Sequence, residues 1–400
     1  MKILVVSQYY YPEPLRINEI CEELVKRGHE VTVLTGRPNY PDGVVYSGYE
    51  DNHFDELLNG VHVLRCSIRP RKKGAKNLLL NYLSYWYKGG RAVRKIPNDF
   101  DVVYSYQLSP ITSSSPACWY SKKYHVPHFL YCLDIWPESV VENISSKSIV
   151  YKYITRLSKK IYSSTDEIGV TSPSFIAYLS KLINRSEERF IYIPQHARDI
   201  SLKTEKEKVD VLNIVFTGNI GASQNLDVLV DAVGLIKDMP GFKVTIVGSG
   251  SDFERLQEKV EMAGLSKLIV FLGRQPKEQM AEYYSIADFC FLSLRDEGAV
   301  SWTIPGKLQE YMSSGKAILA AINGDAKFVI EDAQCGVCVG FDDSHELAKV
   351  IVEYSKDKTQ LKTFGENARN YYLKHFTLAK HVASLEKEFD ALLKKKTTGC

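Results

Sequence analysis

Residues 298–320 read GAVSWTIPGKLQEYMSSGKAILA, and this stretch predicts a loop, a short helix and a buried strand. Pro305 cannot donate a backbone hydrogen bond, so it suits the start of the helix. Gly315 is expected to end the helix, because a left-handed residue is needed there. The small apolar run 317–321 is typical of a strand that is covered on both faces. Helical spacing predicts one inward-packing face, formed by Leu308, Tyr311 and Met312.

Glu310 lies one helical turn beyond Gly306, beside this apolar face. The first N–H groups of a helix have no partner within the helix, so a helix N-terminus attracts anions. A carboxylate just behind those groups suits a ligand that carries both hydroxyls and phosphates. The alternative is a solvated Glu on an ordinary amphipathic helix, and the local pattern by itself favours that alternative.

Longer segments of the sequence favour the ligand-binding interpretation of Glu310. The motif PGKLQEYMSSGK at 305–316 resembles the nucleotide-sugar site of retaining glycosyltransferases with the GT-B fold, in the large family-4 group. Further segments are similar to the branch that builds bacterial surface polysaccharides, above all to the N-acetyl-L-fucosamine transferases of O-antigen and capsule synthesis. These segments are MKILVVSQYYYPEP at 1–14 with RINEICEELVKRGHEVTVLTG at 16–36, YCLDIWPES at 131–139, FTGNIGASQNLDVLVDA at 216–232 and VTIVGSGSDFERL at 244–256.

The resemblance implies an α/β protein of the GT-B class, with two Rossmann-like doubly wound domains that face a cleft. We expect residues 1–195 to form an N-terminal acceptor-binding domain and residues 196–378 a nucleotide-sugar-binding domain. Residues 379–400 are then a helix that crosses back to the first domain, with a tail expected to be disordered from residue 394. The polar and charged stretch 195–210 is the expected linker. A chain of 400 residues is long enough for two such cores.

The start of the chain predicts a parallel sheet from its own pattern. Residues 2–7 and 31–34 are strand-like, and an amphipathic helix closed by Gly28 lies between them. Ligands of such sheets bind near the carboxyl ends of the strands, so the loops after strands are the places to search. In the family, the first of these loops closes over the donor diphosphate and the acceptor. The candidates in this loop and the start of the next helix are Tyr11, Pro12, Glu13, Arg16 and Asn18.

Asp134 directly follows the predicted strand 129–133. Many family members carry a His in the corresponding loop, near the donor sugar. The resemblance therefore suggests that Asp134 acts in catalysis, by orienting an acceptor or by stabilising positive charge on the sugar. The alternative is that Asp134 is the N-cap of a following helix. Glu138 is a further candidate of the same kind, with less support from its position.

Two glycine pairs each follow a predicted strand and precede a helix. Glycine lets backbone N–H groups approach a phosphate or a base closely. In many family members the first of these loops also holds an Arg and a Lys that neutralise the diphosphate. This chain has Asn219, Gln224 and Asn225 there instead. The paired glycines are Gly218 with Gly221, and Gly248 with Gly250.

The charge of the leaving diphosphate must then be met elsewhere. The helix N-terminus at Gly306 and the side chain of Lys307 are the first candidates. The family also has an earlier glutamate at the position of Trp302, so we expect Thr303 or backbone groups to contact the sugar. The residues expected to act in catalysis are Asp134, Lys307 and Glu310. The predicted donor site comprises Gly218, Asn219, Gly221, Gly248, Gly250, Arg274, Arg295, Thr303, Pro305, Gly306, Lys307, Leu308 and Glu310.

The segment 57–98 contains ten Lys or Arg residues and no Asp or Glu. Within it, residues 77–87 read NLLLNYLSYWY, which is apolar and aromatic. One interpretation is a core helix with solvated charges around it. The other is a surface segment in the headgroup region of a membrane, with Trp86 at the interface. An acceptor anchored in a membrane would require the second. Nucleic acid is not an expected partner, because the net charge of the chain is only +3.

The expected reaction is transfer of a sugar, with N-acetyl-L-fucosamine as the candidate, from a UDP-sugar to an undecaprenyl-diphosphate-linked saccharide, with retention of configuration. No cofactor and no metal ion are expected, since a helix N-terminus and basic side chains can hold the diphosphate. The alternatives are a GT-B UDP-sugar 2-epimerase, which needs no acceptor, and a catalytically inactive homologue that serves as a membrane-associated assembly partner.

The expected location follows from three features of the sequence. No apolar run approaches the about 20 residues that span a bilayer. Met1 and Lys2 lead directly into the strand-length run ILVV, which is unlike a secretory signal. The eight cysteines lie mostly inside apolar segments, as reduced and buried thiols do. We therefore expect a cytoplasmic enzyme with peripheral, anionic-lipid contact on the inner face of the plasma membrane.

Overall fold

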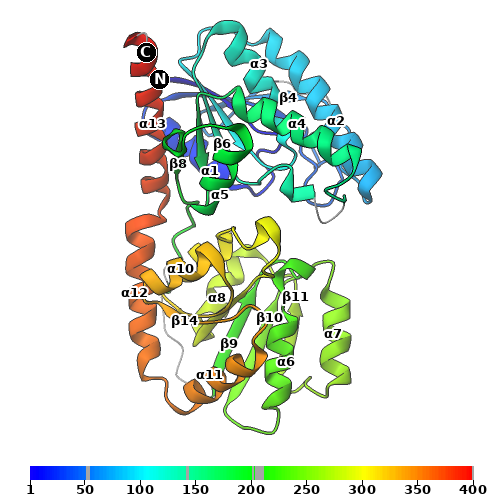
Figure 1. Ribbon diagram of the computed structural model, residues 1–400, viewed down its shortest axis with the longest axis vertical. Coiled ribbons are helices and arrows are strands. Elements are labelled where there is room, and N and C mark those ends of the chain that lie inside the picture. Colours follow the sequence, from blue (N-terminus) through cyan, green and yellow to red (C-terminus); the bar gives the residue numbers. More distant parts are fainter. Residues whose placement is uncertain (51–54, 141–143, 201, 203–210, 399–400) are drawn as a thin grey trace. The chain divides into compact units, whose positions relative to one another are not determined.

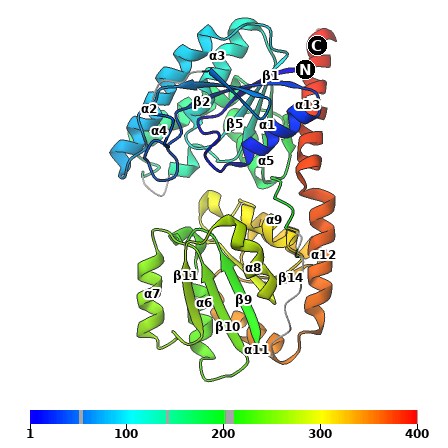
Figure 2. The same ribbon diagram turned by 180° about the vertical axis from the view of Figure 1, so that it is seen from behind.

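The structure is a computed structural model that describes residues 1–50, 55–140, 144–200, 202 and 211–398. The chain divides into two compact units, Met1–Pro194 with Leu378–Cys400, and Gln195–Thr377. Each unit contains one largely parallel sheet with helices on both of its faces (Figures 1 and 2). The prediction of two doubly wound, Rossmann-like domains is therefore confirmed. The expected linker lies largely outside the described residues, at 201 and 203–210.

The sheet of the first unit has the strand order β3-β4-β2-β1-β5-β6-β7-β8, and only β3 and β4 pair antiparallel within it. The strands are β1 (Lys2–Val6), β2 (Glu30–Gly36), β3 (Asp55–Leu58), β4 (Val61–Cys66), β5 (Val102–Gln107), β6 (His128–Cys132), β7 (Glu167–Val170) and β8 (Phe190–Tyr192). The helices are α1 (Arg16–Lys26), α2 (Ala75–Ala92), α3 (Ser115–Tyr124), α4 (Ile149–Ser163), α5 (Ser174–Ile183) and α13 (Leu378–Thr398). Short 3-10 turns are Val93–Lys95, Ile111–Ser114, Glu138–Val140 and Glu187–Arg189.

Strand β1 shows why its run of apolar residues is uninterrupted. Ile3 and Val5 pack into one cluster, which also contains residues of α1 and α13. Leu4 and Val6 pack into a second cluster on the opposite face, which contains residues of α3. Because successive side chains of a strand point to opposite faces, a sheet covered on both sides needs apolar residues at every position.

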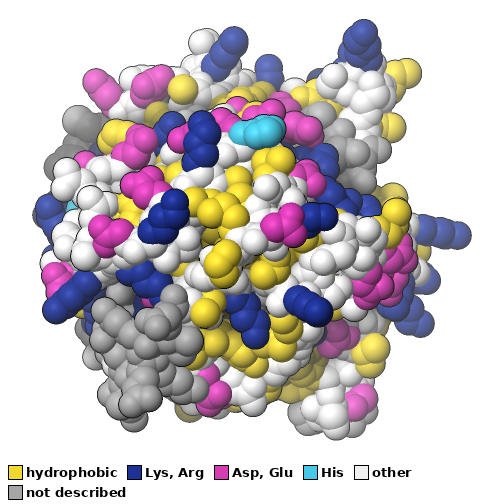
Figure 3. Space-filling model, turned by 90° about the horizontal axis from the view of Figure 1, so that it is seen from below, with side chains coloured by type: hydrophobic (Ala, Val, Ile, Leu, Met, Phe, Trp, Pro, Cys, Tyr) yellow, Lys and Arg dark blue, Asp and Glu magenta, His cyan; other side chains and the backbone are white. Residues whose placement is uncertain are grey.

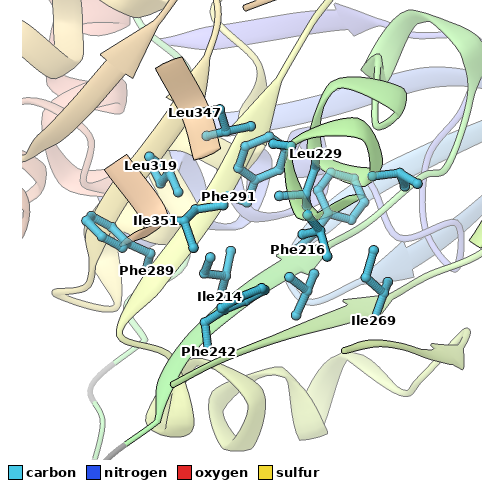
Figure 4. Packing of buried hydrophobic residues seen from close by; sticks show 14 of the residues in the cluster. Ile214, Phe216, Leu229, Phe242, Ile269, Phe289, Phe291, Leu319, Leu347 and Ile351 are labelled. Atoms are coloured by element: carbon cyan, nitrogen blue, oxygen red, sulfur yellow. The ribbon is translucent and has the colours of Figure 1, made fainter. Parts of the chain in front are cut away.

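The second unit has a fully parallel sheet in the order β11-β10-β9-β12-β13-β14. Ile214 and Phe216 of β9 pack with Leu229 of α6 in the cluster of Figure 4, whereas Val215 packs on the other face. The strands are β9 (Leu212–Thr217), β10 (Phe242–Val247), β11 (Ile269–Gly273), β12 (Phe289–Ser293), β13 (Ala317–Ala321) and β14 (Gly336–Val339). The helices are α6 (Asp227–Leu235), α7 (Phe253–Met262), α8 (Met280–Ile286), α9 (Gly306–Ser313), α10 (Gly324–Asp332), α11 (Ser344–Lys356) and α12 (Thr359–His375), with 3-10 turns at Ala222–Gln224, Lys277–Gln279 and Gly298–Val300.

Helix α13 packs on the sheet of the first unit, as the predicted crossing helix should. The Phe389 ring lies 5.6 Å from the ring centroids of both Tyr104 and Phe129. The predicted disorder from residue 394 is wrong for residues 394–398, because α13 continues to Thr398 and Lys395 pairs with Glu167 of β7. Strands β3, β4 and β14 were not among the predicted elements.

Candidate active site

The two glycine loops of the second unit touch each other beyond the carboxyl ends of β9 and β10. A Cβ added to Gly248 would lie 1.8 Å from the carbonyl oxygen of Gly218, and one added to Gly250 would lie 2.1 Å from that of Ile220. Gly218 also has a φ of +120°, which other residues rarely adopt. Backbone contact between the loops therefore requires glycine here, and it gives the loop after β9 a defined position.

Helix α9 brings Lys307 against this first loop. The Lys307 Nζ donates a hydrogen bond to Gln224 Oε1, and it lies 4.4 Å from the centroid of the Phe216 ring. A Cβ added to Gly218 would lie 2.6 Å from Lys307 Cε. Burial lowers the pKa of Lys307 to about 7, and the charge of Glu310 opposes this shift. The Lys307 ammonium therefore has an amide oxygen and an aromatic ring as its contacts beside the glycine loop.

Glu310 is half-buried on the same helix, and its neighbour Tyr311 ties that helix to β9. The Thr217 N–H donates to the Tyr311 hydroxyl at 3.0 Å, and Thr217 Oγ1 lies 3.0 Å from the Tyr284 hydroxyl. Burial raises the pKa of Tyr284, and the nearby charge of Glu310 adds to that effect. The helix that carries Lys307 and Glu310 is thus fastened to the strand that leads into the glycine loop.

Two other polar candidates border the first loop through short-range contacts. The Arg295 N–H donates to the Ser223 carbonyl at 3.0 Å, so the chain after β12 runs beside this loop. A Cβ added to Gly221 would lie 2.9 Å from Asn219 Nδ2, so the Asn219 amide folds over its own loop. Arg274 follows β11 and is exposed. Of the two arginines, only Arg295 is tied to the loop that Lys307 contacts.

The remaining donor candidates lie around the start of α9. Pro305 is the N-cap in an extended conformation, and its carbonyl accepts from the Leu308 N–H at 2.9 Å. The Leu308 side chain is fully buried in the core, so it faces apolar neighbours. Gly306 is the first residue of the helix. Thr303 Oγ1 donates to the Ala299 carbonyl at 3.0 Å, which holds the turn before α9.

In the first unit, Glu13 holds the predicted acceptor loop in place. Its Oε2 accepts from the Tyr10 N–H at 3.0 Å, and its Oε1 accepts from the N–H groups of Asn39 at 2.8 Å and Tyr40 at 2.7 Å. Burial raises the pKa of Glu13 to about 7, while these three N–H groups lower it. The carboxylate therefore links the loop after β1 to the loop after β2.

The other candidates of this loop divide into surface and structural residues. Asn18 Nδ2 donates to the Glu13 carbonyl at 2.7 Å, and the Tyr11 carbonyl accepts from Arg65 at 2.6 Å. Arg65 is buried and pairs with Glu56 of β3, and it is not among the residues predicted for the site. Tyr11 is exposed, Pro12, Arg16 and Asn18 are half-buried, and Glu13 is buried.

Asp134 lies beyond the carboxyl end of β6. Its Oδ2 accepts from the Ser109 N–H at 2.8 Å, and the Ser109 hydroxyl accepts from Trp136 Nε1 at 3.0 Å. The N-cap alternative is wrong, because the carboxylate is bound to the loop after β5 and not to a helix that follows. Burial raises the pKa of Asp134. Glu138 instead accepts hydrogen bonds from the hydroxyls of Tyr151 and Tyr178.

Within the described parts of the chain, no group of three or more His, Cys, Asp or Glu side chains is placed to hold a metal ion. The one Asp-x-Asp triplet in the sequence, at 99–101, serves the fold. Asp99 pairs with the Lys2 ammonium at 2.9 Å, and Asp101 accepts from the Lys2 N–H at 2.7 Å. In the same described residues, no helix combines the length and the apolar character needed to cross a membrane.

Two family models match adjacent parts of the chain and together span most of it. The model for glycosyl transferases group 1 matches residues 197–371, which include both glycine loops and α9. The model for the glycosyl transferase 4-like domain matches residues 15–196. With two Rossmann-like units, the chain is a glycosyltransferase of the GT-B fold class. The group 1 family is represented by its second unit, and the 4-like domain by its first.

Relatives and solved structures agree with this assignment. A protein provisionally named colanic acid biosynthesis glycosyl transferase WcaI, from Escherichia coli K12, is 24% identical over 80% of this chain and 83% of its own. O-antigen chain mannosyltransferase C of Escherichia coli is 21% identical over 99% of this chain and 100% of its own. The fold matches Anabaena HepE, crystallised with UDP-glucose, with a TM-score of 0.70 over 98% of this chain and 100% of that chain, at 16% identity.

Proposed function

We propose that this glycosyltransferase moves a sugar from a UDP-sugar, with retention of configuration, to a lipid-linked saccharide in the synthesis of a surface polysaccharide. The observation that carries the donor side is the position of α9, which brings Lys307 against the Gly218 loop with Glu310 one turn further on. A cation, a glycine loop and a carboxylate at the carboxyl edge of a parallel sheet suit a nucleoside diphosphate. The named relatives WcaI and mannosyltransferase C support the polysaccharide setting.

Each residue has a defined part in this proposal. Glu310 accepts hydrogen bonds from the ribose hydroxyls. Lys307 leaves Gln224 and neutralises the leaving diphosphate, together with the N-terminus of α9. No metal ion and no cofactor take part. Asp134 orients the acceptor hydroxyl, and the leaving phosphate takes the proton of that hydroxyl. The protein therefore acts chiefly by positioning the reactants and by stabilising the charge of the leaving group.

Helix α2 supports a membrane-anchored acceptor. Its inner face is buried through Asn81 and Tyr85, whereas Trp86 and Tyr87 on its outer face are 38% and 60% exposed. Leu79 and Leu83 are exposed along the same helix. The core-helix interpretation of residues 77–87 thus applies to the inner face of α2, and the membrane-surface interpretation applies to its outer face. An exposed apolar face with exposed lysines at 72, 73 and 76 suits the headgroup region of an anionic membrane.

The donor sugar that we propose is N-acetyl-L-fucosamine, on the strength of the resembling segments. The test is mass spectrometry of products from a panel of UDP-sugars, including UDP-N-acetyl-L-fucosamine, with undecaprenyl-diphosphate-linked saccharides. Transfer with an unchanged anomeric configuration, read by NMR, supports the proposal. A 2-epimer formed without acceptor would replace it with the epimerase alternative. UDP-sugar binding with no turnover on any acceptor would indicate the inactive assembly partner.

A further inference from the structure

Four side chains of the first unit gather beyond the carboxyl ends of its strands, and we call them the Arg71 patch. The members are Tyr40, Arg71, Tyr82 and Asp134. Tyr40 lies in the loop after β2, Arg71 lies between β4 and α2, Tyr82 is on α2, and Asp134 follows β6. They come from four separate segments, so only the fold brings them together.

Arg71 is held in place by its surroundings, unlike the lysines that follow it. Its N–H donates to Asn39 Oδ1 at 2.7 Å, and Asn39 is itself buried and bound to Glu13. Its guanidinium lies 5.4 Å from the centroid of the Tyr40 ring. Tyr40 in turn lies 5.3 Å from the ring of the buried Tyr9. The guanidinium therefore rests on an aromatic support that is anchored to the sheet, so little side-chain freedom remains to be lost on binding.

The patch retains unused hydrogen-bonding capacity. Within the described residues, the Arg71 guanidinium makes neither an ion pair nor a hydrogen bond, and the Tyr82 hydroxyl has no hydrogen-bond partner. Asp134 accepts from Ser109, through its N–H at Oδ2 and through its side chain, and an ionised carboxylate has about four acceptor sites, so it can still accept from a further donor. Burial raises the pKa of Tyr82, with Arg71 opposing and Asp134 and Tyr40 adding to the shift, so its phenol lies within electrostatic range of all three. Donors, an acceptor and ring faces thus converge where an α/β enzyme binds its ligands.

We propose that the Arg71 patch is the acceptor subsite for an oxyanion, namely a phosphate of the lipid diphosphate, and that Asp134 takes a hydroxyl of the adjoining sugar. This inference rests on the proposed function, since it specifies the acceptor of that reaction. A guanidinium presents two parallel N–H groups that match the oxygens of a phosphate, and a carboxylate accepts from a sugar hydroxyl. The carboxylate of an acidic sugar offers the same oxyanion, so the experiment has an arm for each source.

The test uses the full chain with UDP at saturation, so that the donor site is filled, and isothermal calorimetry with two probes. Geranyl diphosphate represents the lipid diphosphate, and methyl glucuronoside represents an acidic sugar. The variant is Arg71→Gln. Its matched control is Arg91→Gln, because Arg91 also stacks on a tyrosine, 5.7 Å from the Tyr87 ring, but at the far end of α2. Loss of hydrogen bonds to a charged group predicts at least about tenfold weaker binding in Arg71→Gln.

Arg71-dependent binding of geranyl diphosphate supports the proposal as stated. Arg71-dependent binding of the glucuronoside alone would mean that Arg71 binds the carboxylate of an acidic sugar and not a lipid phosphate. The proposal is overturned if neither probe binds, or if both variants bind the probes equally. UDP affinity and melting temperature are measured first, to test whether Arg71→Gln is folded. If Arg71→Gln is not folded, Arg71→Lys, which retains the charge, takes its place. Failure of the parent enzyme to bind UDP would count against the proposed function, while the probes would still test the patch.

Discussion

At the scale of single residues, the proposed donor site contains a lysine, Lys307, whose hydrogen-bond and ring contacts are neutral. Lys307 donates to Gln224 and lies over the Phe216 ring, where related enzymes are expected to place an Arg and a Lys on the glycine loop. Burial of an ammonium favours its neutral form, which is why the pKa of Lys307 falls to about 7. A diphosphate would reverse this preference, because an adjacent negative charge stabilises the ammonium.

The first prediction concerns pH. The pKa of free Lys307 is lowered to about 7, and a diphosphate bound beside it would raise that pKa, so UDP binding should take up a proton at and above neutral pH. UDP affinity should therefore fall as pH rises from 7 to 9, with a limiting slope of about tenfold per pH unit. Uridine affinity should stay flat. Calorimetry in buffers of different ionisation enthalpy measures both, and Lys307→Met should abolish the slope. An equal slope in that variant would assign the proton to another group.

The second prediction concerns Glu310. Glu310→Ala should weaken UDP and uridine alike, by about 1.5–3 kcal/mol, because both ligands carry the ribose whose hydroxyls the carboxylate would accept. Glu297→Ala is the matched control, since Glu297 is an exposed glutamate in the loop before α9. Titration calorimetry with the two ligands measures the loss. Unchanged affinities in a folded Glu310→Ala protein would remove the residue from the donor site.

At the scale of elements, the proposed donor site depends on how α9 is joined to β9. The Tyr311 hydroxyl accepts from the Thr217 N–H, one residue before the glycine loop begins. Tyr284 of α8 reaches only the Thr217 side chain, and the two tyrosine rings lie 5.8 Å apart, nearly perpendicular. One buried hydroxyl therefore couples the helix that carries Lys307 and Glu310 to the strand that carries the loop.

The third prediction separates these two tyrosines. Tyr311→Phe leaves the buried Thr217 N–H without its acceptor, so unfolding free energy should fall by about 1–3 kcal/mol and UDP affinity should fall with it. Tyr284→Phe should cost less, because the Thr217 hydroxyl still has Tyr311 at 3.4 Å. Urea denaturation and UDP titration of both variants provide the comparison. If the two variants behave alike, the hydroxyl of Tyr311 has no special part in holding α9.

At the scale of the whole molecule, charge is concentrated locally although the net charge is small. The chain carries a net charge of +3, and basic and acidic side chains are interspersed over the face shown in Figure 3. The segment 57–98 departs from this, with ten basic residues and no acidic ones. Its members have different surroundings, because Arg71 stacks on Tyr40 whereas the lysines at 72, 73 and 76 are exposed. We therefore expect that a membrane surface would contact these three exposed lysines.

The fourth prediction is that replacing Lys72, Lys73 and Lys76 by Ser reduces sedimentation with anionic vesicles, most strongly at low salt. Each lysine near an anionic surface contributes about 1 kcal/mol, and the attraction is screened beyond a Debye length. The control replaces Lys237, Lys243 and Lys267, which are exposed in the second unit, and so changes the net charge equally. Equal vesicle binding by both triple variants would refute a specific membrane face.

The sequence by itself determined the fold class and most of its elements. The apolar runs of β1 and β13, the glycines after β9 and β10, and the start of α9 at Pro305 all follow from local rules about burial and backbone freedom. Strands β3 and β4 escaped prediction because their runs, DELL and VHVLRC, place charged residues among the apolar ones. Such a pattern has a meaning only once the pairing of the strands is known.

Only the tertiary structure decided which side chains meet. Lys307 and Gln224 are 83 residues apart, and Tyr311 and Thr217 are 94 apart, yet each pair is in contact. Glu13 is a predicted site residue of its loop, but its carboxylate accepts from three backbone N–H groups of two loops. In the sequence Arg71 is one of several basic residues in a row, and only the fold places the Tyr40 ring against its guanidinium. Local sequence determines the conformation of each segment, whereas strand order and register determine which loops become neighbours. Strand order and register depend on pairings between distant segments, so local sequence patterns do not reveal them.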